Sequence, residues 1–137
     1  MYHNLYFFKR VDRKDKMHIY LPYGKESKVR KKMKLLYQQK EIELKQCTTF
    51  ISRLKGFMGK KEIHSALLFN HCNSIHTFFM KTNIAVIFCN KDNQILSYYQ
   101  NVPPNQIIFP QKGATKTFEL PVNYFNVKPN DRLEIKK

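Results

Sequence analysis

Glycine-rich loops, paired cysteines and long apolar runs are missing from this sequence, and each absence excludes a class of protein. Only four glycines occur in 137 residues, and none forms a phosphate-binding loop. The three cysteines contain no C-x-x-C pair, which argues for reduced thiols and against structural zinc. No apolar run reaches the ~20 residues of a membrane-spanning helix. We therefore expect one globular, cytoplasmic protein with no signal peptide and no transmembrane segment.

Acidic residues are also few, with 10 Asp and Glu against 25 Lys and Arg, and the formal net charge is +15. Paired carboxylates for hydrolysis are therefore scarce, which favours a non-enzymatic role. The excess of cations favours polyanionic partners.

Residues 1–41 hold 12 Lys and Arg and 4 Asp and Glu, a net charge of +8, with aromatic residues between the cations. This composition predicts a basic N-terminal extension that binds nucleic acid, an anionic surface or an acidic partner. The alternative is an extension that is partly disordered. A third possibility is that residues 1–32 are dispensable, because Met33 begins a stretch that reads like the start of the domain.

From residue 42 onward the pattern is regular and predicts a single β-rich domain over 42–137. EIELKQC alternates and predicts a strand, while TTFISRLKGFMG predicts a short helix with one apolar face, from Phe50 and Ile51 to Met58. NIAVIFCN is apolar on both faces and predicts a central strand, with QILSYYQ as its hairpin partner. The fold class is mainly β (α+β): a small β-barrel or sandwich-like domain of short strands with one or two short helices.

Five motifs in order resemble those of the domain of unknown function 192 family, also called uncharacterised protein family 0127, over about residues 42–135. They are RLKGFMGK at 53–60, ALLF at 66–69, IHTFFM at 75–80, NIAVIF at 83–88 and FELPVNYFNVKPNDRL at 118–133. The resemblance implies a small β-rich domain in a bacterial or archaeal protein, and no settled activity.

The departures from the family pattern are specific. Ala85 stands where family members usually carry an Asp, so a polar site of the relatives is expected to be lost. Asn123 and Asn130 replace two glycines of the C-terminal signature. Because Asn tolerates left-handed backbone better than most residues, we expect both at positive φ. Gly56, in the helix motif, is also expected to have a structural role.

The stretch HCNSIHTFFM places a thiol, an imidazole and a thioether four residues apart, at Cys72, His76 and Met80. On an extended strand such positions are about 13 Å apart, too far to share one metal ion. A turn at Asn73 and Ser74 would still allow a partial site for Cu(I) or Zn at Cys72 and His76. The alternative is that Cys72 and Met80 fill the core, and no cofactor is evident.

A ligand-binding pocket is the preferred hypothesis for this segment. His76 and Thr77 are polar groups in an apolar stretch, and Arg53 and Lys81 are bases of the family motifs. If these four residues lie close together, they can attract a small anion or an acidic partner.

Overall fold

The computed structural model describes residues 32–137, which form nine strands and one short helix. In chain order they are β1 (Met33–Tyr37), β2 (Lys40–Gln46), α3 (Phe50–Lys55), β3 (Ala66–Asn70), β4 (Ile75–His76), β5 (Ile84–Cys89), β6 (Ile95–Val102), β7 (Ile107–Ile108), β8 (Lys116–Leu120) and β9 (Glu134–Lys136). The expected mainly-β class is confirmed, and the strands expected around residues 42–47, 84–89 and 95–102 are present.

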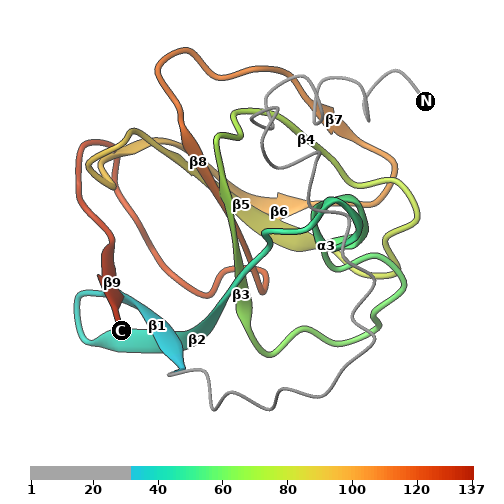
Figure 1. Cartoon of the computed structure of the whole chain (residues 1–137), viewed down its shortest axis with the longest axis horizontal. Coiled ribbons are helices and arrows are strands. Elements are labelled where there is room, and N and C mark those ends of the chain that lie inside the picture. The colour runs from blue at the N-terminus through green and yellow to red at the C-terminus, as the bar shows by residue number, and fades with distance from the viewer. Residues whose placement is uncertain (1–31) are drawn as a thin grey trace.

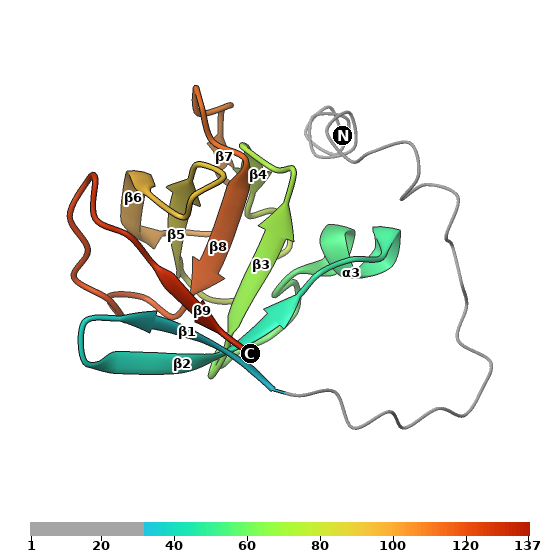
Figure 2. The same ribbon diagram turned by 60° about the vertical axis from the view of Figure 1, so that its left-hand side comes forward.

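Seven strands form one curled sheet in the order β6-β5-β8-β3-β2-β1-β9 (Figures 1 and 2). The two outer strands approach each other through a bridge between Gln94 and Arg132, supported by the backbone bond from Ile95 N to Asp131 O at 2.7 Å. The sheet is therefore barrel-like. A second, two-stranded sheet, β4 with β7, lies at one end of the molecule (Figure 1).

Two apolar cores lie on opposite faces of the sheet. Because side chains alternate along a strand, β3 and β5 supply both cores. Leu68 and Ile87 belong to the inner core, whereas Leu67 and Val86 belong to the outer one. The outer core is completed by Phe57, which follows α3, and by Ile75 and Ile108 of the small sheet. This double burial is why NIAVIFCN has apolar residues at every position of the strand.

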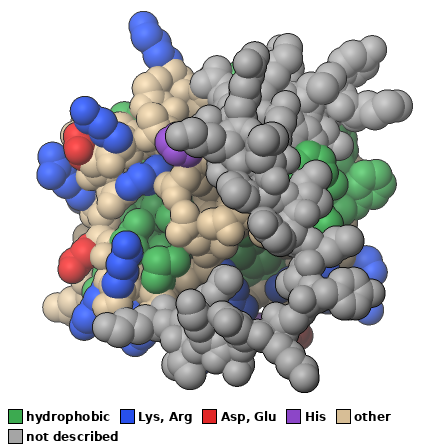
Figure 3. Space-filling model, viewed as in Figure 1, with side chains coloured by type: hydrophobic (Ala, Val, Ile, Leu, Met, Phe, Trp, Pro, Cys, Tyr) green, Lys and Arg blue, Asp and Glu red, His purple; other side chains and the backbone are tan. Residues whose placement is uncertain are grey.

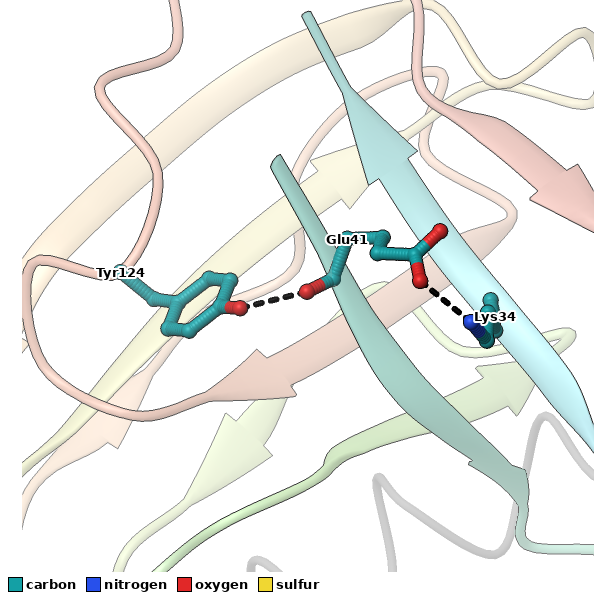
Figure 4. A network of polar contacts seen from close by, with 3 residues as sticks. All are labelled: Lys34, Glu41 and Tyr124. Atoms are coloured by element: carbon teal, nitrogen blue, oxygen red, sulfur yellow. Dashed lines mark hydrogen bonds and ion pairs between the residues drawn. The ribbon is translucent and has the colours of Figure 1, made fainter. Parts of the chain in front are cut away.

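The start of the domain lies earlier than the expected boundary at residue 42. β1 pairs with both β2 and β9, so residues 33–41 are part of the sheet. Between β1 and β2, Lys34 and Glu41 form an ion pair, and the Tyr124 hydroxyl donates to the Glu41 carbonyl at 2.5 Å (Figure 4). The rest of the predicted extension, residues 1–31, lies outside the described part of the chain.

Both asparagines of the C-terminal signature adopt the backbone conformation expected of them. Asn123 has φ 56° and Asn130 has φ 73°. The Asn130 amide also donates to the Ile95 carbonyl at 2.9 Å, which helps to join the two outer strands. Replacement of glycine by asparagine therefore keeps the turn geometry of the fold.

Candidate functional site

The short helix α3 is stabilised at its N-terminus by a capping box. The Thr49 hydroxyl accepts a hydrogen bond from the Ser52 amide at 3.1 Å, and the Ser52 hydroxyl accepts one from the Thr49 amide at 3.0 Å. This capping box satisfies two amides that have no partner within the helix. Gly56 ends the helix, with φ 47° and ψ −125°. The two caps set where this six-residue helix begins and ends.

The side of α3 that faces the sheet carries a cation. Arg53 is only 4% exposed, whereas Ile51 is 55% exposed. The Arg53 guanidinium lies 6.0 Å from the ring centre of Phe69 on β3. The predicted apolar face of this helix was therefore wrong at Ile51. The buried side chain between α3 and the sheet is that of Arg53, which is charged.

A buried acid lies next to the end of the same helix. Glu119 sits on β8 between Leu67 of β3 and Val86 of β5, on the face of the sheet that forms the outer core. It is 5% exposed, and its Oε2 has no hydrogen-bond partner within residues 32–137. Burial raises the pKa of the Glu119 carboxyl to about 8, because desolvation disfavours the charged form.

Arg53 and Glu119 line one small cavity together with His76. The cavity has a volume of about 10 Å³, and its other walls come from the end of α3 and the segment after β4. These are Leu54, Lys55, Gly56, Phe57, Met58, Phe78 and Met80. A space of this size holds one water-sized atom. We call it the Arg53–Glu119 niche. It brings together side chains from three elements that are far apart in the sequence.

His76 enters the niche with a defined tautomer. Its Nδ1 accepts a hydrogen bond from the Phe78 amide at 3.3 Å, and its ring stacks on Phe78 with centroids 5.3 Å apart. A neutral imidazole that accepts at Nδ1 carries its proton on Nε2. His76 thus presents a donor nitrogen as its second polar atom.

The other two predicted binding residues are placed differently. The Thr77 hydroxyl donates to the Pro103 carbonyl at 2.7 Å and accepts from the Gln106 amide at 2.9 Å, so it holds two chain segments together. Lys81 is exposed and is not among the residues that line the niche. Lys55, the last residue of α3, is the second cation there. The structure therefore joins Arg53 with His76, but not with Thr77 or Lys81.

Cys72 and Met80 occupy apolar surroundings. Cys72 is 2% exposed, its thiol donates to the Ser74 carbonyl at 3.1 Å, and burial raises its pKa. Met80 packs against the outer core, as expected of a structural residue. Within the described residues no group of three or more His, Cys, Asp or Glu side chains is placed to hold a metal ion. No helix in residues 32–137 is long and apolar enough to cross a membrane.

Glu119 is the residue of the niche that the sequence did not reveal. In ATKTFELP it alternates with Phe118 and Leu120, which is the pattern of an acid on a solvent-facing side. That face is covered by α3 and by the segment after β4, both of which are distant in sequence. The one available signal was its place within the FELP motif of the family resemblance.

Comparison with known proteins shows what this chain is similar to. The profile of domain of unknown function 192, described as an uncharacterized ACR, matches residues 33–135. A UPF0127 protein of Thermococcus sibiricus is 30% identical over 95 residues, which are 63% of this chain and 61% of that protein. This chain thus spans about three-fifths of the length of that relative.

Two solved structures share the fold. One is a candidate transcription regulator of Sinorhizobium meliloti, with a TM-score of 0.64 and 18% identity, covering 75% of this chain and 91% of that one. The other is a protein of unknown function from Novosphingobium aromaticivorans, with a TM-score of 0.62 and 16% identity, covering 75% and 83%. At such identities the likeness concerns the fold alone. The profile match over three-quarters of the sequence carries the assignment, and the chain belongs to the uncharacterized DUF192 (UPF0127) family.

Proposed function

We propose that this domain is a non-enzymatic binding module that takes a small anionic group in the Arg53–Glu119 niche. The observation that carries the proposal is the burial of Arg53, which is 4% exposed beside a cavity that it lines. Removing a guanidinium from water is costly, so a buried one marks a place where its charge is used.

The charge and size of the niche favour an anion over a cation. Arg53 and Lys55 both line the cavity, and His76, whose Nδ1 accepts from the Phe78 amide, can donate from Nε2. A cationic ligand would meet these groups unfavourably. The volume of about 10 Å³ admits one oxygen atom of a carboxylate, with the remainder of the molecule outside. The ligand class is therefore a small acid, or a larger molecule that ends in an acidic group.

Titration with sodium formate, followed by amide chemical shifts and calorimetry, tests the proposal. We expect shifts at Gly56, His76 and Phe78. Arg53→Met, which removes the charge but keeps most of the volume, should weaken formate binding about tenfold or more, as for a charged hydrogen bond. Lys81→Met is the matched control, because Lys81 lies outside the niche.

Arg53→Lys keeps the charge and guards against misfolding of the Met variant. It should bind formate more strongly than Arg53→Met does. If formate moves no amide near the niche, or if Arg53→Met binds it as well as the original protein, the niche is not an anion site.

A second proposal concerns the basic surface. Residues 32–137 carry 16 Lys and Arg against 7 Asp and Glu, a net charge of +9, and several Lys and Arg side chains stand out at the left of the view in Figure 3. Residues 1–31 add 9 Lys and Arg against 3 Asp and Glu. We propose binding of a polyanion, with the N-terminal residues contributing. Affinity for a single-stranded oligonucleotide should fall steeply with salt, and deletion of residues 1–32 should reduce the slope.

A further inference from the structure

Glu119 is one of the residues that line the niche. The Oε2 atom of its carboxyl is buried and has no hydrogen-bond partner in the described part of the chain. Buried polar atoms are almost always partnered, by protein or by a bound molecule. An unpartnered oxygen on a side chain that is 95% buried therefore indicates a position where a water or a ligand completes the bonding.

We propose that Glu119, as a carboxylic acid, donates a hydrogen bond to the bound anion, so that anion binding and proton uptake are coupled. This inference rests on the proposed function and names the ligand as a carboxylate. When Glu119 is ionised, a carboxylate in the niche would face a second negative charge. When it is protonated, the same oxygen becomes a donor that the anion can accept from.

The geometry keeps the acid accessible to one ligand atom and otherwise dry. Gly56 has no side chain, and a Cβ there would stand 3.2 Å from Oε2 of Glu119. The strands beside Glu119 present Leu67 and Val86, which are apolar. The position also accords with the raised pKa of this carboxyl, about 8, which keeps the acid form dominant at neutral pH.

The other titratable or charged groups around Glu119 can be named. Arg53 and Lys55 come from α3 and line the same cavity. Cys47 follows β2, and burial raises its pKa to about 12, so it is a neutral thiol below pH 9. Cys72 is likewise held neutral by burial. His76 is the remaining titratable residue that lines the niche, and the variant His76→Asn tests its contribution to the pH dependence.

The proton balance predicts a specific dependence on pH. Above pH 8 the free protein has lost the Glu119 proton, and binding of one carboxylate takes one proton from solvent. Affinity for formate should therefore be nearly constant up to pH 7 and about 30-fold weaker at pH 9.5, by linkage to a pKa of about 8. Glu119→Gln keeps a donor at this position and cannot ionise. Its affinity should be the same at both pH values.

Calorimetry with formate at pH 7 and pH 9.5, on the full chain and in two buffers of different ionisation enthalpy, makes the measurement. His76→Asn is the control, because its amide oxygen can still accept from the Phe78 amide while it cannot titrate. The inference predicts that the pH dependence persists in His76→Asn and disappears in Glu119→Gln. If formate affinity falls equally from pH 7 to pH 9.5 in Glu119→Gln and in the original protein, the inference is wrong. It is also wrong if the affinity falls in neither protein. Both results are compatible with the proposed binding of an anion.

A second readout does not depend on a variant that folds. In protein labelled with ¹³C at glutamate carboxyls, saturating formate should raise the titration midpoint of Glu119. A midpoint that formate leaves unchanged overturns the coupling. If formate moves no resonance near the niche, the proposed function fails, and the inference fails with it.

Discussion

Gly56 and Glu119 lie so close that a single methyl group on Gly56 would stand 3.2 Å from Oε2 of Glu119. One residue ends a helix and the other is in the middle of a strand more than 60 positions later. Both residues line the niche, and a side chain at position 56 would press on the buried carboxyl.

The first prediction follows from that contact. Gly56→Ala adds a Cβ at φ 47°, where backbone strain costs about 1–3 kcal/mol, and presses it against a buried carboxyl. The free energy of unfolding, measured in urea, should fall by that amount or slightly more. Gly59→Ala is the matched control, since φ is also positive there but nothing lies within 4 Å of the added Cβ. An equal loss in both variants would show that the carboxyl contact has no effect.

The second prediction concerns stability against pH. The pKa of Glu119 is about 8 in the folded protein and near 4.5 when unfolded. As pH rises from about 4.5 to about 8, the unfolded chain therefore loses the proton while the folded chain keeps it. This group's contribution is fully present below pH 4.5, is lost as pH approaches 8, and amounts to a few kcal/mol, at about 1.4 kcal/mol for each pH unit.

Urea denaturation at pH 5, 6, 7, 8 and 9 measures this loss. Because Glu119→Gln cannot ionise, the stability of the original protein relative to this variant should decline with pH and level off above pH 8. A difference between the two proteins that is constant across the series would contradict the raised pKa of Glu119.

The third prediction separates a structural hydroxyl from a binding one. Thr77→Val leaves the Pro103 carbonyl and the Gln106 amide without their partner, and each lost partner costs about 1–3 kcal/mol. Thr77→Ser keeps the hydroxyl and should be clearly more stable than Thr77→Val in thermal unfolding. Formate affinity of the folded Val variant should equal that of the original protein. A selective loss of formate binding in Thr77→Val would return Thr77 to the list of ligand-binding residues.

Local patterns in the sequence predicted the strands well, because alternation reports which face of a strand is buried. The central position of Ile84–Cys89 was predicted because a strand buried on both faces has apolar residues throughout. The left-handed positions of Asn123 and Asn130 were predicted from backbone preference and the family's glycines. These properties depend on short-range chemistry, which a sequence displays directly.

The niche could be predicted only in part, because its members meet through the fold. Helical spacing pointed to Ile51 as buried, but in the fold Ile51 is exposed and Arg53 is buried beside Phe69. Glu119 lies beneath a helix some 65 residues earlier in the chain, so its local pattern resembles that of an exposed acid. The sequence of a strand does not show whether an element that is distant in the chain covers one of its faces.

The pairing of β1 with β9 has a consequence for biosynthesis. Leu35 pairs with Ile135, so one hundred residues separate the two partners in the chain. While the chain is being translated, the outer edge of β1 stays open until residues 134–136 have emerged. Pairings of such high contact order form slowly, and an open edge can recruit another chain in the meantime. The interval before residues 134–136 pair with β1 is therefore the stage at which this edge is most open to pairing with another chain.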